Sequence, residues 1–186
     1  MSRLPQIVPG STTSEVQGLF DAVQKKLGMV PNMMRAMANS PGVLEGYLQF
    51  SNSIGRGSLT AKQRQQIALA VSQDNGCDYC LAAHATIARS VGLTADQIRD
   101  SRHSLAVDSK TNALLQFVRK IVDQRGHIDD LDVDGLRELG FTDSDIAETV
   151  AHVALSVLTN YFNIVAGTDV DFPRAPALDS VPAETN

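Results

Sequence analysis

The chain has two cysteines, Cys77 and Cys80, which stand three residues apart and are followed by His84. On a helix these positions fall at i, i+3 and i+7, so the three side chains project from one face. Two cysteines at this spacing can close a disulfide with little movement of the backbone. A histidine one turn beyond Cys80 can take the proton of its thiol or stabilise its thiolate. The pattern therefore predicts a redox-active dithiol.

Three other interpretations of the two cysteines stay open. A structural zinc site needs four ligands as a rule, and a fourth would have to come from His103, His127 or His152, none of which has ligand spacing. A purely structural disulfide closing so short a loop would remove little entropy from the unfolded chain. Two cysteines can also pack as small buried hydrophobes. The histidine on the same face favours the redox interpretation, and we expect neither a metal nor a bound cofactor.

The residues around this motif are expected to form helices, because apolar residues recur at helical spacing and no segment alternates as a strand does. Gly, Pro and Asn residues divide the chain, and Ser or Thr followed three residues later by Gln or Asp marks several helix starts. These signals predict an all-α fold whose helices open near Ser14, Pro31, Leu44, Thr60, Cys77, Thr94, Ala113 and Thr142.

Length and composition predict a single domain covering residues 1–186. With 186 residues, of which 43% are apolar, the chain can bury one hydrophobic core but is short for two. The helical pattern places that core at about residues 30–166, and the tail from 167 to 186 is expected to be extended. A shift of 82 positions lays residues 59–84 over 141–166 with three identities, which leads to the hypothesis of a duplicated helix pair.

The charge pattern argues against a nucleic-acid-binding protein. The formal net charge is −5, and no basic stripe interleaved with aromatic residues is present. The N-terminal segment lacks the apolar stretch of a secretion signal, and no segment is expected to span a membrane. We therefore expect a cytoplasmic protein that binds neither nucleic acid nor membranes.

Several other residues are expected to be structural. Met33, Met34 and Met37 recur at helical spacing, which favours the core or a subunit interface ahead of a substrate pocket. His152 lies within an apolar helical segment and is expected to be a buried imidazole with its hydrogen bonds satisfied. The acidic run at 127–134 lacks the glycine and the final glutamate of a calcium loop, so we expect a solvated linker whose acids favour the N-terminus of the next helix.

The segment Leu59–Ser72, followed by Asn75–Cys80 and His84, resembles the core of alkylhydroperoxidase D-like (AhpD-like) proteins of the carboxymuconolactone decarboxylase superfamily. Val30–Asn32 and the ending Tyr161–Pro173 resemble its peroxidase-related branch. The resemblance covers most of the chain. It implies an all-α AhpD-like fold, assembly into homo-oligomers such as trimers or hexamers, and thiol-dependent reduction of alkyl hydroperoxides.

The resemblance also implies roles for the two cysteines. The second cysteine attacks the peroxide in that family, so Cys80 would become a sulfenic acid and Cys77 would condense with it to form the disulfide. A small dithiol protein or domain would then reduce the pair again. A helix N-terminus favours a thiolate at Cys77 instead. We follow the family pattern, because His84 is better placed for Cys80.

The sequence departs from the family pattern at the start of the proton relay. The family has a glutamate twelve residues before the first cysteine, and this chain has Gln65; a second common glutamate corresponds to Gln63. Glutamine keeps the hydrogen-bonding shape but cannot exchange a proton at neutral pH. Peroxidase activity is therefore expected to be weak, unless water or another acid completes the relay. The candidate acids are Asp78, Glu45 and Glu148.

Two other functions compete with a thiol peroxidase. A lyase of the carboxymuconolactone decarboxylase kind would not need the cysteine pair, which counts against that activity here. A non-catalytic oligomeric binding or stress-response module would keep the fold after its relay had decayed, and Gln65 favours that alternative.

Overall fold

A computed structural model describes residues 2–178, and this part of the chain contains helices and no strand, which confirms the predicted all-α fold. Its helices are α1 (Ser14–Leu27), α2 (Asn32–Met37), α3 (Pro41–Ile54), α4 (Ala61–Asp74), α5 (Asp78–Ser90), α6 (Ala95–Arg102), α7 (Ser109–Asp123), α8 (Asp130–Glu138) and α9 (Asp143–Ala166).

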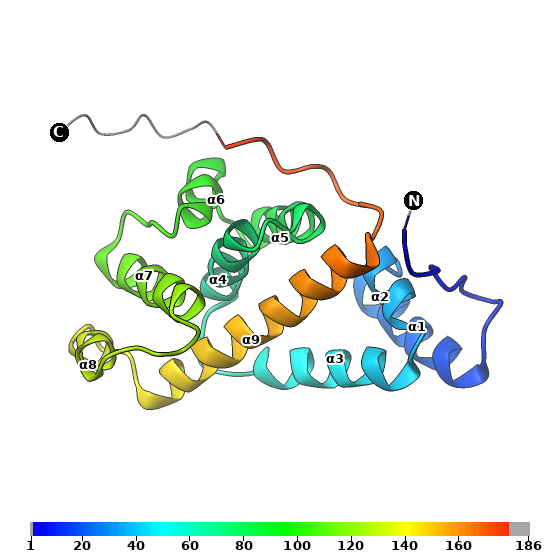
Figure 1. The fold of residues 1–186 in the computed structure, drawn as a ribbon, viewed down its shortest axis with the longest axis horizontal. Helices are drawn as coiled ribbons and strands as arrows, with labels where there is room; N and C mark the ends of the chain where they lie inside the picture. Colours follow the sequence, from blue (N-terminus) through cyan, green and yellow to red (C-terminus); the bar gives the residue numbers. More distant parts are fainter. Residues whose placement is uncertain (1, 179–186) are drawn as a thin grey trace.

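Helix α4 lies at the centre of the fold and packs against α5, α6, α7 and α9 (Figure 1). Seven consecutive residues of α4, from Gln66 to Ser72, are buried, because neighbouring helices cover it on several sides. One apolar cluster joins α4 to α7 and α9, and a second joins α1, α2 and α3 to the start of α5. The two cysteines belong to the second cluster.

Most of the predicted helix starts agree with the structure. Thr60, Thr94 and Thr142 each form a reciprocal capping box with the Gln or Asp three residues later. The first helix differs, because Thr13 rather than Ser14 is its N-cap and accepts a hydrogen bond from the Val16 amide. The side chain of Gln17 instead accepts a hydrogen bond from the amide of Gly10 at 2.7 Å, so it closes the preceding loop.

The acidic run at 127–134 is not a linker throughout, because α8 begins within it. Asp129 and Asp132 form a reciprocal capping box, and acidic residues in a first helical turn interact favourably with the helix dipole. Leu136 is buried in the cluster of α4, α7 and α9 and anchors the helix there. The acids therefore favour a helix start as expected, but this start lies inside the run and shortens the linker.

The proposed duplication of a helix pair is wrong at this spacing. Thr60 and Thr142 both cap helices, so the first helix of the pair does correspond. The turn at Asn75–Gly76 then separates α4 from α5, whereas the matching part of α9 continues without a break to Ala166. Gly76 has a φ of 64°, a conformation that glycine adopts most readily, so the turn depends on a residue that α9 lacks.

After α9, residues 167–178 carry no helix and run back over α5 and α6 (Figure 1). The Phe172 ring meets the Tyr79 ring edge-on, with 5.8 Å between centroids. Arg102 of α6 donates a hydrogen bond to the carbonyl oxygen of Pro176 at 2.7 Å. The end of the predicted tail lies outside the described residues, so the single-domain organisation over residues 1–186 stays a prediction.

Within residues 2–178, α9 is long and apolar enough to cross a membrane. The expectation that no segment approaches a membrane span is therefore wrong by length and composition alone. The helix packs against α3, α4, α5 and α7, and its buried residues include polar ones such as Thr149, Asn160 and Asn163. These contacts are typical of a core helix in a folded domain.

Candidate functional site

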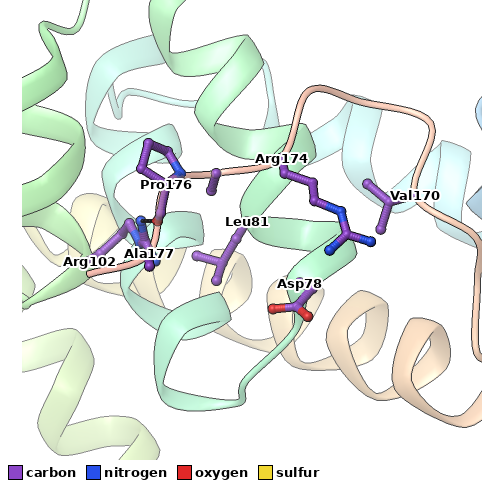
Figure 2. A pocket seen from close by; sticks show the side chains of 8 residues that line it. Asp78, Leu81, Arg102, Val170, Arg174, Pro176 and Ala177 are labelled. Carbon is purple, nitrogen blue, oxygen red and sulfur yellow. Dashed lines mark hydrogen bonds between the residues drawn. The ribbon is translucent and has the colours of Figure 1, made fainter. Parts of the chain in front are cut away.

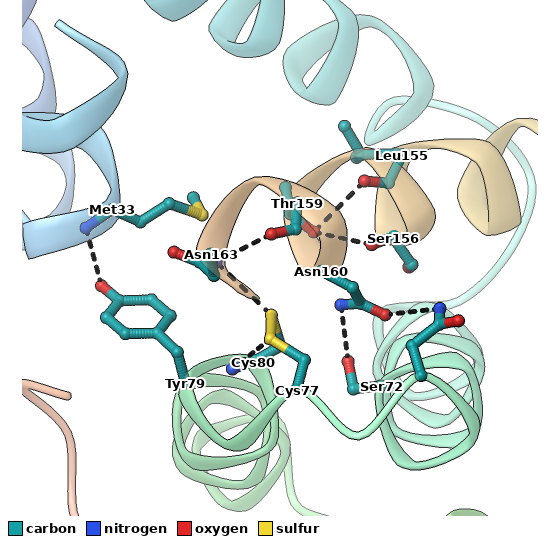
Figure 3. Close-up of a disulfide and its surroundings, with 11 residues drawn as sticks. Met33, Ser72, Cys77, Tyr79, Cys80, Leu155, Ser156, Thr159, Asn160 and Asn163 are labelled. Carbon is teal, nitrogen blue, oxygen red and sulfur yellow. Dashed lines mark hydrogen bonds between the residues drawn. A yellow bond between two sulfur atoms is a disulfide. The ribbon is translucent and has the colours of Figure 1, made fainter. Parts of the chain in front are cut away.

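Cys77 and Cys80 are joined by a disulfide at the start of α5, with their Cα atoms 5.3 Å apart (Figure 3). Cys77 is the N-cap of α5, and its sulfur accepts a hydrogen bond from the Cys80 amide at 3.2 Å. Both residues are buried, with exposed fractions of 1% and 2%. The predicted pairing of the two thiols on one helical turn agrees with this geometry.

Asn163 of α9 contacts the second cysteine and was not expected from the sequence. Its Nδ2 donates to the Cys80 sulfur at 3.4 Å and to the carbonyl oxygen of Thr159 at 2.9 Å (Figure 3). A hydrogen bond to sulfur favours the thiolate over the thiol. Three polar residues inside the apolar α9, Thr159, Asn160 and Asn163, were the available signal in the sequence.

A second side-chain network holds the turn before the cysteines against α9. Asn160 donates from Nδ2 to the Ser72 hydroxyl at 3.1 Å (Figure 3). Asn75 donates from Nδ2 to Asn160 Oδ1 at 3.0 Å. Ser72 and Asn160 are fully buried, so each needs a partner within the protein. This network connects the end of α4 to α9 and orients the loop that carries Cys77.

Gln65 of α4 and His84 of α5 form a hydrogen bond of 2.9 Å between Oε1 and Nδ1. An amide oxygen only accepts hydrogen bonds, so Nδ1 of His84 carries the proton and Nε2 is the basic atom of the ring. Burial lowers the pKa of His84 to about 4, so the imidazole is neutral at pH 7. Gln65 therefore contacts the histidine, while its side chain makes no described hydrogen bond to either cysteine.

The low pKa of His84 predicts a loss of stability in mild acid. The unfolded chain takes up the proton near pH 6.5 and the folded chain only near pH 4, so acid favours the unfolded state between these values. Urea denaturation measures the part of the free energy of unfolding that the neutral His84 contributes. We expect this part to be fully present above pH 6.5 and to fall by about 1 to 3 kcal/mol as the pH approaches 4. His84→Gln should remove this part of the slope, and an unchanged slope in the variant would contradict the assignment.

None of the three candidate acids hydrogen-bonds to the cysteines or to His84 in the described contacts. Asp78 is exposed on the first turn of α5, and Glu45 accepts a hydrogen bond from its neighbour Gln49. Glu148 accepts hydrogen bonds from the amides of Ser58 and Leu59 at 2.9 and 3.0 Å. Its carboxylate therefore holds the loop before α4.

A cavity of about 510 Å³ lies beside the motif, and His84 and Gln65 form part of its wall. Residues of α1 to α5 and α9 line it, together with Phe172, and most of the wall is apolar. Tyr79 also lies on the wall, and its hydroxyl accepts a hydrogen bond from the Met33 amide at 3.1 Å. Burial raises the pKa of Tyr79, so its hydroxyl stays neutral.

The methionines lie in the core, one of the two places expected for them, and His152 is buried as expected. Met33, Met34 and Met37 are buried within the chain's own core, and the first two also line the cavity, which was ranked below the core and an interface. His152 is buried as expected and its ring hydrogen-bonds to the backbone of Ile54. Its Nε2 has no hydrogen-bond partner among the described residues, so this imidazole is not fully satisfied.

A smaller cavity of about 260 Å³ lies between α5, α6 and the C-terminal segment (Figure 2). Asp78, Leu81, Arg102 and Arg174 are on its wall. Arg102 is buried, and it donates to Gln73 Oε1 at 3.0 Å as well as to the Pro176 carbonyl oxygen, so its main contacts are structural. Over residues 2–178, no cluster of three or more His, Cys, Asp and Glu side chains is placed to hold a metal ion.

The family model that matches the chain is that of the carboxymuconolactone decarboxylase family, over residues 41–124. This stretch runs from the start of α3 to just past the end of α7 and contains both cysteines, Gln65 and His84. None of the curated proteins is significantly similar to the chain.

Solved structures with the same arrangement of helices include two at 28% sequence identity. The alkylhydroperoxidase AhpD core of an uncharacterized peroxidase-related protein from Ralstonia eutropha JMP134 has a TM-score of 0.82, with 91% of this chain and 92% of that chain covered. An uncharacterized peroxidase-related protein from Silicibacter sp. TM1040 has a TM-score of 0.79, with 89% and 88% covered. The debrominase Bmp8 shares the fold at 18% identity, with a TM-score of 0.74 and 91% of each chain covered.

Proposed function

The chain is an AhpD-like member of the carboxymuconolactone decarboxylase superfamily, and we propose that it is a dithiol peroxidase that reduces organic hydroperoxides. Its similarity to peroxidase-related proteins supports an antioxidant-related role. The observation that carries the proposal is the Cys77–Cys80 disulfide on the helix whose His84 faces an apolar cavity. A dithiol, a neutral base and a substrate-sized cavity are the parts that such a reaction needs.

In the first step, the Cys80 thiol gives its proton to Nε2 of His84, and the thiolate attacks the outer oxygen of the hydroperoxide. The O–O bond breaks, the sulfur becomes a sulfenic acid, and the alkoxide leaves as an alcohol after taking the proton from His84. In the second step, the Cys77 sulfur attacks the Cys80 sulfur and the S–O bond breaks. The hydroxide leaves as water with the proton of Cys77, so two thiols and one hydroperoxide yield a disulfide, an alcohol and water.

Gln65 acts in this scheme as a positioning residue. Its hydrogen bond to Nδ1 orients the ring and keeps Nε2 as the basic atom. The amide cannot carry a proton away, so His84 must exchange protons with water in the cavity. Slow exchange at this point is the physical reason to expect a lower rate than a glutamate at position 65 would allow.

Regeneration requires a dithiol reductant protein or domain that exchanges with the disulfide. Both sulfurs are buried in the single chain, so the start of α5 must open before a second protein can reach them. We further propose that the protein acts in the cytoplasm as a homo-oligomer, a trimer or hexamer. Exposed apolar residues along α9, including Leu158, Tyr161 and Val165, support an assembly through that helix.

The proposal predicts a single turnover without any added reductant. When fully reduced protein is mixed with cumene hydroperoxide, we expect one equivalent of cumyl alcohol per chain and the loss of both alkylatable thiols. Mass spectrometry of the peptide containing Cys77 and Cys80 should show the loss of two hydrogens. Two thiols that remain alkylatable after the peroxide has been in excess would contradict the proposal and favour a non-catalytic binding module.

The non-catalytic module remains the second candidate, because Gln65 replaces the relay acid and the disulfide is buried. The lyase alternative has no comparable support among the described contacts. Decarboxylation of a lactone acid by a protein with both cysteines replaced by alanine would be evidence for it.

A further inference from the structure

We propose that the cavity beside His84 binds organic acids, and that Arg64 holds the carboxylate of the ligand while the apolar wall holds its hydrocarbon part. The inference names the substrate class of the proposed peroxidase, a hydroperoxide that carries a carboxylate. It rests on the proposed function only for the peroxide group. Binding of the acid itself follows from the charges and contacts of the cavity wall.

The charged groups on the cavity wall are all of one sign. Among the described residues that line it, the two side chains charged at neutral pH are Lys26 and Arg64, and no aspartate or glutamate is present. Lys26 is exposed near the end of α1, beside the exposed Leu27 and Met29, which identifies this region as the mouth. Arg64 is half-buried on α4. An anion that enters past Lys26 therefore meets a second cation on the wall.

Arg64 has hydrogen-bond donors left for a ligand. One nitrogen, Nη1, donates to the carbonyl oxygen of Leu59, and Arg64 makes no ion pair with any described carboxylate. Glu148 contacts the same loop, but its carboxylate accepts hydrogen bonds from the amides of Ser58 and Leu59. A half-buried guanidinium without a carboxylate partner is a common recognition element for carboxylate ligands.

His152 supplies a second, independent indication of a ligand at this part of the wall. It lies on the cavity wall with an exposed fraction of 8%, and its Nε2 has no partner among the described residues. A buried polar atom without a partner is costly unless a ligand or an ordered water supplies one. Arg64 of α4 and His152 of α9 line the same cavity, and burial and the charge of Arg64 lower the pKa of His152 while the charge of Glu148 raises it. A bound carboxylate would let the ring take up a proton and donate from Nε2.

The size and lining of the cavity define the rest of the ligand. A volume of about 510 Å³ holds a chain of roughly eight carbons with room to spare. Met33, Met34, Leu48 and Leu155 line the wall and give a hydrocarbon chain favourable contacts. The ligand is therefore an amphipathic acid whose charged end is bound by Arg64 and whose apolar part lies along these side chains.

Octanoate and 1-octanol test the binding part by titration calorimetry on the oxidised protein, which cannot turn over. We expect octanoate to bind at least about tenfold more tightly than 1-octanol, and Arg64→Gln to weaken octanoate binding by about 10 to 100-fold. Lys62→Gln, which removes a charge from the same helix outside the cavity, should change neither affinity. Equal affinity for the two ligands in the natural protein would overturn the inference.

Two further variants make the result independent of damage to the fold. Arg64→Lys keeps a positive charge near the cavity and should retain most of the preference for octanoate. His152→Phe keeps a ring of similar shape but removes Nε2, and we expect severalfold weaker octanoate binding with unchanged 1-octanol binding. If Arg64→Gln unfolds, octanoate and 1-octanol are compared on the natural protein and on Lys26→Gln. Equal affinity for the two ligands in the natural protein still overturns the inference.

A matched pair of hydroperoxides separates this inference from the proposed function. An eight-carbon hydroperoxy acid should oxidise the reduced protein at least about tenfold faster than its methyl ester at limiting concentration, and Arg64→Gln should remove the difference. Equal rates for acid and ester would overturn the inference and leave the peroxidase standing. Tight octanoate binding without oxidation by either compound would overturn the peroxidase and leave the binding of acids standing.

Discussion

Replacing Cys80 with serine is expected to abolish hydroperoxide reduction, with a fall in rate of at least about 10³-fold, because the hydroxyl of serine is a far weaker nucleophile than a thiolate. The measurement is alcohol formation in a single turnover of the reduced variant. Both sulfurs of the natural site have a hydrogen-bond donor, from the Cys80 amide to Cys77 and from Asn163 to Cys80. These contacts favour a thiolate at either sulfur, and the variant decides which of the two attacks the hydroperoxide.

Cys77→Ser is the matched control for this prediction. It should still consume one equivalent of hydroperoxide but stop at the sulfenic acid of Cys80, which dimedone would trap. Because Cys77 is the N-cap of α5, the serine hydroxyl at this position can still accept the hydrogen bond from the Cys80 amide. Full turnover in Cys80→Ser, or a sulfenic acid found on Cys77, would contradict the assigned order and favour the thiolate at the helix start.

Replacing His84 with glutamine is expected to slow the oxidation of Cys80 by about 10² to 10⁴-fold, because the proposed mechanism gives the Cys80 proton to this imidazole and glutamine cannot accept it. The glutamine side chain can still hydrogen-bond to Gln65, so the packing between α4 and α5 should survive. The rate of thiol alkylation as a function of pH, measured beside the peroxide rate, reports thiolate formation directly. An unchanged peroxide rate in this variant would show that the proton goes elsewhere.

Gln65→Glu is the companion of this variant and is expected to change the reaction rate in the opposite direction. A carboxylate at Oε1 would raise the pKa of His84 from about 4 and could carry protons to the cavity. We expect about a tenfold faster single turnover, together with a weaker loss of stability in mild acid. A slower reaction in Gln65→Glu would mean that the site requires the amide, and that the lack of proton exchange at position 65 does not limit the rate.

Local patterns in the sequence were enough for the helices and for the main chemical groups. The capping residues Thr60, Thr94 and Thr142 and the glycine at 76 act on their own neighbours, so their effects can be predicted without the fold. Cys77, Cys80 and His84 are likewise one local motif, because i, i+3 and i+7 positions meet on any helix. The departure at Gln65 was also visible, since it needed only a comparison with the family pattern.

Contacts between distant segments could not be predicted in this way. Nothing near Cys80 in the sequence indicates that Asn163, 83 positions later, donates to its sulfur. Glu148 was a candidate for the relay, but the fold directs its carboxylate from α9 to the amides of the loop before α4. The sequence indicated that the acids at 127–134 favour a helix start, but not that α8 begins inside the run, because Leu136 stabilises that helix through the buried cluster of α4, α7 and α9.

By itself, therefore, the sequence determined an all-α chain with one dithiol, one adjacent histidine and a glutamine in place of the relay acid. Only the tertiary structure decided which groups share the cavity. It brings His84 of α5 to Gln65 of α4, and it places Arg64 of α4 and His152 of α9 on the same wall. The physical reason is that helix periodicity fixes which side chains within about two turns share a face. A cavity is instead formed by side chains that are distant in sequence, and helix packing decides which of them meet. Charge and burial at such a site exist only once the helices have packed.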